Sequence, residues 1–241
     1  MDKLVGTKES PNASVVVLDY ALCVQMLKPQ FCKNSMEYIE KIFLPYIKQS
    51  IENVQKPDLV WDEYIPNNLK ASTRQKRGTG ARRRVLPSMV PRNWQEFFRL
   101  DDTKKELFLF LSEQVMKMAI EGKQIIVTKG EEADTRTMVH IADAVQDGHQ
   151  SVMIRSTDTD VVVLAVAAVA TLEDLKELWV SYGTGKNHQI LPANLFAKTL
   201  GLTKSKCLPI FHALTVRHNI FLRWVWKKNS LGSLSELSTC Y

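Results

Sequence analysis

The sequence predicts an α/β fold in which a mainly parallel sheet carries helices on both faces. Several short runs are rich in valine and isoleucine and do not alternate with polar residues, as in strands that are covered on both sides. Stretches with helical spacing separate these runs, which implies strand–helix–strand crossovers. The 241 residues, 45% hydrophobic and 24% charged, have an ordinary globular composition and make one large domain or two small ones.

Taken in chain order, the apolar runs give the strands of this sheet. They are bounded by polar or charged residues, and the first, second and fourth end on Asp19, Asp62 and Ser156. The predicted strands are Ser14–Asp19, Asp58–Asp62, Lys123–Thr128, Ser151–Ser156, Val161–Val166 and Leu178–Tyr182.

Helical periods fill most of the chain between these strands. Apolar residues recur on one face in Ser35–Val54, Asp102–Ile120 and Glu132–Val145, which we predict to be helices. Residues 66–101 contain no predicted strand and only weak helical signals. Because loops of this length are usually functional or disordered, we interpret this segment as a mobile basic insertion near the site. The predicted organisation is a tail over 1–13, a domain over 14–215 and a second tail over 216–241.

The first residues and the apolar runs argue against a membrane protein. The start has no apolar signal-peptide core, so we expect no secretory signal. The longest apolar run, 161–172, is well short of the roughly twenty residues of a membrane-spanning helix. The four cysteines show no metal-like spacing, and reduced thiols are therefore expected. These features predict a soluble, intracellular protein without membrane partners.

A block of positive charge lies inside the predicted insertion. Without any acid to offset it, the segment 70–84 attracts a polyanion, most commonly nucleic acid. A solvated loop and a nuclear-import signal are alternative interpretations. The basic residues that we expect to contact nucleic acid are Lys70, Arg74, Lys76, Arg77, Arg82, Arg83 and Arg84.

Acidic residues follow several of the predicted strands. The carboxyl ends of parallel strands meet at one edge of a sheet, where ligands bind in open α/β folds. Neighbouring carboxylates repel each other unless a cation neutralises them, and Mg²⁺ or Mn²⁺ is the expected cation. Two such ions can clamp the attacking and leaving oxygens of a phosphodiester. The candidate ligands are Asp19, Asp62, Glu132, Asp134, Asp158 and Asp160.

Each acid also has a purely structural interpretation, and Asp19 and Asp62 could be turn residues. Glu131, Glu132 and Asp134, taken singly, are better explained as caps of a helix N-terminus than as ligands. The pair Asp158 and Asp160 could form a turn; if extended, both carboxylates would point the same way. These explanations do not account for four acidic sites at one predicted edge together with a basic loop.

Two further sequence patterns do not meet the spacing of the sites that they resemble, a phosphate-binding loop and a zinc site. The segment GTGK, 183–186, lacks the spacing of a phosphate-binding loop, and we expect a glycine turn after a strand. The five histidines lack the spacing of a zinc site.

The ordered set of motifs resembles the PIN-like nuclease superfamily, in particular its flap-endonuclease and asteroid-type branch. VVVLDYALCVQML is similar to the first strand with its aspartate, although Tyr20 replaces the usual glycine. DLVWDEYIPNNLKASTRQKR resembles the next strand and its basic gateway segment, GEEADTRTMVHIADA the Glu-Ala-acid motif, and STDTDVVVLA the Asp-x-Asp motif. Within this branch, the similarity is strongest to uncharacterised multicopy proteins of invertebrates and fish that look mobile-element-associated.

The resemblance implies a PIN-like three-layer sandwich that cleaves structured or single-stranded nucleic acid with divalent metal ions. It assigns the six acids named above to the metals or their waters. It also implies that Lys70, Arg74 and Arg77 steer the scissile phosphate.

After His212–Thr215 the sequence departs from that family. The family continues with Gly-Cys-Asp-Thr, whose aspartate is a further metal ligand, whereas this chain continues with VRHNIFLRWVWKKNSLG. Codons for residues 216–219 can be written GTG-CGA-CAC-AAT, and reading them from the second base gives Cys-Asp-Thr. We therefore hypothesise a missing base near codon 216, with residues 216–241 translated out of frame. The alternative is an ordinary divergent tail.

Three functions stay open at this point. The chain is an active or residually active Mg²⁺-dependent nuclease, a catalytically inactive or degenerate nucleic-acid-binding module, or a protein-interaction domain in which the acids are caps.

Overall fold

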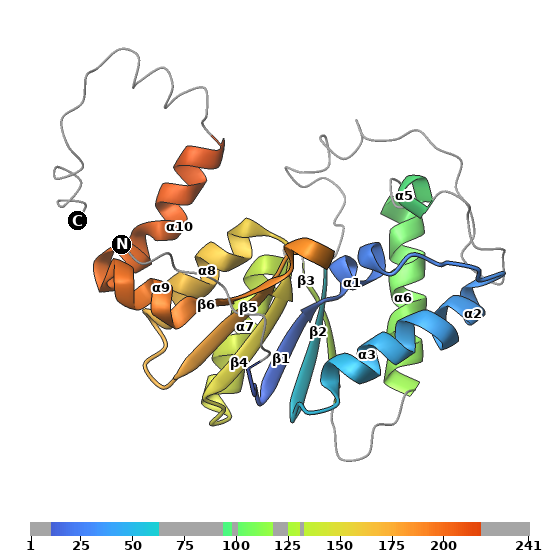
Figure 1. Cartoon of the computed structure of the whole chain (residues 1–241), viewed down its shortest axis with the longest axis horizontal. Helices are drawn as coiled ribbons and strands as arrows, with labels where there is room; N and C mark the ends of the chain where they lie inside the picture. The colour runs from blue at the N-terminus through green and yellow to red at the C-terminus, as the bar shows by residue number, and fades with distance from the viewer. Residues whose placement is uncertain (1–10, 63–93, 98–100, 118–124, 131–132, 218–241) are drawn as a thin grey trace, which may run out of the picture.

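A computed structural model describes residues 11–62, 94–97, 101–117, 125–130 and 133–217 (Figure 1). The basic residues between Lys70 and Arg84 lie outside these ranges, as do Glu132 and residues 218–241. In the part of the chain that is described, no helix is long and apolar enough to cross a membrane.

One six-stranded sheet, in the order β3-β2-β1-β4-β5-β6, forms the centre of the fold (Figure 1). The first five strands pair in parallel, and β6 runs antiparallel to β5. Their bounds are β1 Val15–Asp19, β2 Lys56–Asp62, β3 Ile126–Gly130, β4 Ser151–Ser156, β5 Glu177–Tyr182 and β6 Gln189–Pro192. The mainly parallel sheet is therefore confirmed.

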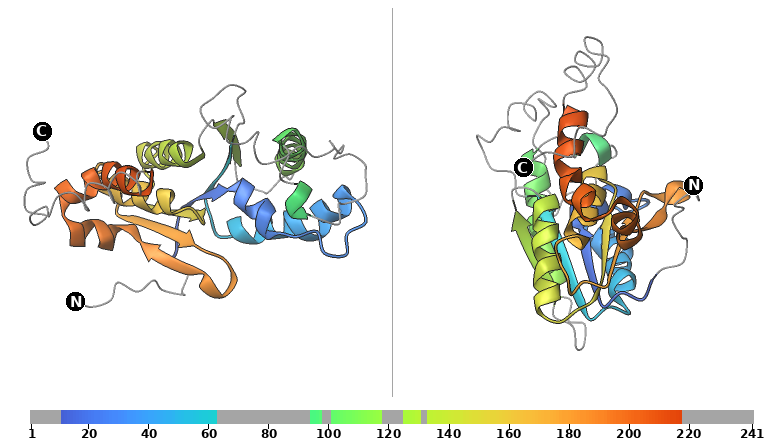
Figure 2. Two further views of the ribbon diagram at one scale, coloured as in Figure 1. Left: turned by 90° about the horizontal axis from the view of Figure 1, so that it is seen from above. Right: turned by 90° about the vertical axis from the view of Figure 1, so that its left-hand side faces the viewer.

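Helices cover both faces of this sheet, and the right-hand view of Figure 2 shows α7 and α3 on opposite sides of the strands. Alternate residues of one strand reach the two cores: Val16 and Leu18 pack with one helical layer, Val15 and Val17 with the other. The first layer contains α1 Tyr20–Met26, α2 Ser35–Tyr38, the π-helical turn Ile39–Phe43, α3 Leu44–Ile51, α5 Trp94–Phe97 and α6 Asp101–Lys117. The second contains α7 Ala133–Gln146, α8 Thr159–Val169, α9 Ala193–Leu200 and α10 Leu202–Arg217. The predicted three-layer α/β arrangement is confirmed.

One predicted strand is wrong. Residues Val161–Val166 belong to helix α8, which begins at Thr159 and runs to Val169. The helix is apolar on almost every side, since Val161, Ala165 and Val166 are buried and their neighbours are half-buried. Its sequence therefore lacks the polar face that gives a helix its visible period, and the run looks like a strand covered on both sides.

Candidate active site at the carboxyl edge of the sheet

Four adjacent parallel strands, β3, β2, β1 and β4, end at the same edge of the sheet (Figure 1). The chain moves outward from β1 through β2 to β3 and then returns to pair β4 with the other side of β1. The strand order thus reverses between β1 and β4, and this is the place where open α/β sheets bind ligands. In the sequence, each of the predicted acidic residues comes at or just after the last residue of one of these strands.

Asp19 is the last residue of β1 and caps the helix that follows directly. Its Oδ1 accepts a hydrogen bond of 3.0 Å from the Leu22 N–H, so the chain turns into α1 without a loop. In the register with β2, Asp19 lies opposite Val60, two residues before Asp62. The carboxyl-bearing positions of β1 and β2 are therefore close along this edge.

Asp62 ends β2, and its backbone pairs with Gly130, the last residue of β3. Glu132 comes next in the chain and lies outside the described residues, while Asp134 is in the first turn of α7 and half-buried. Three of the six predicted acids therefore come at or shortly after the ends of β2 and β3 in the sequence.

Asp158 and Asp160 open helix α8 and do not form an extended pair ahead of a strand. The Asp158 Oδ1 accepts a hydrogen bond of 2.9 Å from the Asp160 N–H, which makes Asp158 the N-cap. The Ser156 hydroxyl accepts a bond of 3.1 Å from the Asp158 N–H and fixes the turn between β4 and the helix. The turn that the sequence allowed for Asp158 and Asp160 is present, and Asp158 and Asp19 each cap the helix that follows them. A carboxylate has about four lone-pair sites, so a capping bond leaves capacity for other ligands.

Asp160 also makes a contact that the sequence did not reveal. Its Oδ1 lies 2.8 Å from Nε2 of His212, which comes from α10. The two residues are 52 positions apart, and no short-range spacing signals such a pair. The contact joins the Asp-x-Asp segment to the His-Ala-Leu-Thr segment, after which the resemblance breaks off.

No group of three or more metal-binding side chains converges among the described residues. The side chains of Asp62 and Glu132 are not among those that the structure describes. The convergence of the six acids stays a prediction, as does the role of the basic residues.

A second unpredicted feature lies beneath the edge on the α7 side. Asp58 in β2 is fully buried, and its Oδ2 lies 2.7 Å from Nδ1 of His140 in α7. The other ring nitrogen of His140 lies 2.7 Å from the hydroxyl of Thr128 in β3. This chain connects β2, which ends at Asp62, with β3 and with α7, which carries Asp134 in its first turn. The sequence signal was an aspartate inside an apolar strand, which needs a buried partner.

The GTGK segment forms the expected glycine turn. It follows β5 and contains the short 3₁₀ turn Gly185–Asn187, and it leads into β6, not into a helix. This arrangement differs from the strand–loop–helix arrangement of a phosphate-binding loop.

No protein-family model and no curated protein matches the chain. Among solved structures, the chain is similar to a flap endonuclease of bacteriophage T5 in a pseudo-enzyme–product complex with DNA and metal ions, with 14% identity and a TM-score of 0.42. The match covers 73% of this chain and 57% of the phage protein, less than two thirds of its length.

Proposed function

We propose that this chain is a divalent-metal-dependent nuclease that hydrolyses phosphodiester bonds in structured or single-stranded nucleic acid, as flap endonucleases do. The observation that carries the proposal is the placement of acidic residues at the ends of four adjacent parallel strands. Neighbouring strands lie about 4.8 Å apart, so the ends of β2, β1 and β4 span roughly 10 Å. That width accommodates two metal ions about 4 Å apart with their carboxylate and water ligands.

The donor set suits Mg²⁺ or Mn²⁺, because all six candidate ligands are carboxylates and hard cations prefer oxygen. When bound, such ions stabilise negative charge on the oxygens of the scissile phosphate. The residues that would hold them are Asp19, Asp62, Glu132, Asp134, Asp158 and Asp160. The basic segment 70–84 would hold the nucleic-acid backbone by neutralising phosphates.

We further propose that the chain belongs to the asteroid-type branch, with one domain over 14–215, and has lost its normal continuation through a missing base near codon 216. The sequence after Thr215 supports this, because it lacks the aspartate that the resemblance leads us to expect. Resequencing the locus tests the idea, and a reading frame that permits no Cys-Asp-Thr overlap after codon 215 would exclude it.

The nuclease proposal is tested with two substitutions at one position. Asp158→Asn keeps an oxygen that can cap α8 but removes the negative charge, whereas Asp158→Ala removes both. If Asp158 binds metal, the Asn variant loses at least about a hundredfold in Mg²⁺- or Mn²⁺-dependent cleavage of branched and single-stranded oligonucleotides, with an unchanged melting temperature. If the Asn variant cleaves like the parent and only the Ala variant melts early, Asp158 is a cap alone.

The Asp160–His212 contact favours a second candidate, a binding module without turnover. His212 already occupies one oxygen of Asp160, and the acid expected after Thr215 is missing. In that case the chain binds oligonucleotides in a salt-sensitive way but does not cleave them. If neither oligonucleotide binding nor thermal stabilisation by Mn²⁺ is found, the protein-interaction domain is the remaining candidate.

A further inference from the structure

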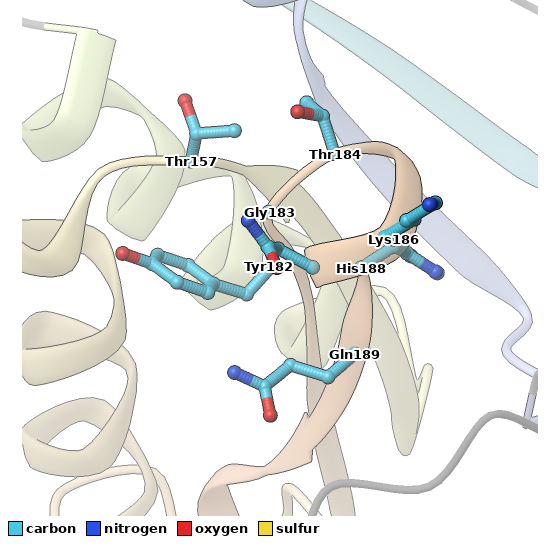
Figure 3. Close-up of a pocket in the computed structure, with 8 residues that line it drawn as sticks. Thr157, Tyr182, Gly183, Thr184, Lys186, His188 and Gln189 are labelled. Atoms are coloured by element: carbon cyan, nitrogen blue, oxygen red, sulfur yellow. The ribbon is translucent and has the colours of Figure 1, made fainter.

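The turn between β5 and β6 borders an open hollow of about 700 Å³ next to the acidic edge (Figure 3). Thr157, which immediately precedes the capping Asp158, forms part of its wall. The other lining residues come from the turn and the ends of its two strands, and none of them carries a carboxylate. Hydroxyl, amide and imidazole groups line it together with the ammonium of Lys186. The hollow thus presents hydrogen-bond donors and a positive charge beside Asp158.

The backbone of this turn has a fixed shape. Gly183 has a φ of +78°, and a Cβ at this position would collide with the main-chain oxygen of Asn187. The Asn187 N–H donates to the Thr184 carbonyl at 3.1 Å, and the His188 N–H donates to the Gly185 carbonyl at 3.2 Å. The turn therefore folds back on itself, and these internal hydrogen bonds keep its shape without a ligand.

A hydrogen-bonded chain supports the turn from β4. The Arg155 guanidinium donates to the Ser181 carbonyl at 2.8 Å and to the Ser181 hydroxyl at 3.2 Å. The same hydroxyl lies 2.8 Å from Nε2 of His188. Because the hydroxyl oxygen accepts from Arg155, its proton is available to Nε2, which leaves the ring proton of His188 on Nδ1. Burial, and then the charge of Arg155, lower the pKa of His188, so the ring is neutral at pH 7.

Two positive charges, those of Arg155 and Lys186, belong to this turn and its support. Within the described part of the chain, neither Arg155 nor Lys186 forms an ion pair with a carboxylate. The Tyr182 ring and Lys186 project to opposite sides of the turn (Figure 3). Groups spread in this way suit an extended ligand that crosses the turn better than a compact one. A strand of nucleic acid supplies both matching parts, since its bases stack on aromatic rings and its phosphates pair with ammonium groups.

We propose that the turn Gly183–His188 is a binding site for a single strand of nucleic acid, which crosses it on the way to the acidic edge. The proposal rests on the proposed function for the class of substrate, but it does not require that the chain cleave. Lys186 neutralises a phosphate of the strand, and Tyr182 provides a face for a base.

The test measures binding of a short fluorescein-labelled single-stranded oligonucleotide to the full chain by fluorescence anisotropy, with excess EDTA so that no cleavage occurs. Lys186→Gln is compared with Lys198→Gln, which makes the same charge change at an exposed lysine of α9. Lys186→Gln is expected to weaken binding about three- to tenfold more than Lys198→Gln. It should also reduce the slope of log Kd against log salt by about 0.7, the value for one phosphate of a single strand.

The other outcomes overturn either the site or the proposed function. Equal effects of the two variants mean that only net charge matters, and absence of binding by the parent chain excludes the site outright. Displacement of the oligonucleotide by inorganic phosphate at equally low concentration means a compact phosphate site and not a strand. Cleavage is measured separately, with Mg²⁺ or Mn²⁺ in place of EDTA. If the chain cleaves but Lys186→Gln has no specific effect on binding, the strand-binding site is overturned and the proposed function stands. If Lys186→Gln has a specific effect on binding but the chain does not cleave, the proposed function is overturned and the strand-binding site stands.

Discussion

At the scale of single residues, the best-defined polar interaction is the buried chain of Asp58, His140 and Thr128. Besides the Oδ2 that faces His140, Asp58 has an Oδ1 without a hydrogen-bond partner among the described residues. Among the described residues, the side chain that forms a hydrogen bond with this carboxyl group is His140. Burying an acidic group in this position lowers the stability of the folded protein unless its partner is present.

Replacing His140 by leucine should therefore destabilise the protein by about 3 kcal/mol, because it leaves a buried carboxylate without a partner. Thr128→Val is the matched control, since it removes the outer hydrogen bond of the chain while keeping the shape of the side chain, and we expect a loss of about 1 kcal/mol. Urea denaturation followed by circular dichroism measures both values. Equal losses would show that Asp58 does not depend on the imidazole.

Residues of this kind mark the limit of prediction from sequence. The end of β1 at Asp19 and the end of β4 at Ser156 are visible as breaks in apolar runs, because a strand ends where polar residues begin. The contacts of Asp58 with His140 and of Asp160 with His212 join positions 82 and 52 residues apart. Such pairs depend on how helices dock on the sheet, which local patterns do not specify.

At the scale of elements, the five parallel strands and the helices α3, α6 and α7 correspond to predicted elements. Residues of α8 were predicted as a strand, and β6 and the helices α1, α5, α9 and α10 were not predicted. The long helix α6 has one apolar face toward the core and a polar face outside, and its period is plain in the sequence. Helix α8 is buried between the sheet and α10, so it shows no polar face. Strand β6 has only four residues and pairs with β5 across a turn whose shape depends on two glycines with positive φ.

Those two glycines allow a direct test of the turn. Gly183→Ala should destabilise the protein by about 2–3 kcal/mol, because the new methyl group meets the Asn187 main chain and the backbone is in the left-handed region. Gly185→Ala is the control, since it has a similar φ of +55° but no atom within 4 Å, and its cost should be about 1 kcal/mol. Thermal or urea unfolding measures the difference. If the alanine at Gly185 is as costly as that at Gly183, backbone strain and not the collision governs the turn.

At the scale of the whole molecule, the two helical layers differ in their buried chemistry. The layer with α1 and α3 contains Tyr20, Tyr38 and Cys23, all buried. Burial raises the pKa of Cys23 to about 12, with a further increase from Asp19. Burial also raises the pKa of both tyrosines, with a smaller effect of Cys23 on each. These groups stay protonated in the folded chain at a pH where an unfolded chain releases their protons.

This difference predicts that the protein loses stability at alkaline pH. The unfolded values are 9.0 for the thiol and 10.0 for the phenols. As the pH rises above these values, the unfolded chain binds fewer protons than the folded chain, so the free energy of unfolding falls. Each group contributes about 1.4 kcal/mol per pH unit until its folded pKa is reached. Urea denaturation between about pH 8 and pH 11 should show this decline. Tyr38→Phe is the control, because it removes one of the three groups, and its hydroxyl has no hydrogen-bond partner among the described residues. The variant should be at least as stable near pH 8 and lose stability less steeply above about pH 10, and a decline as steep as in the parent would contradict a contribution from Tyr38.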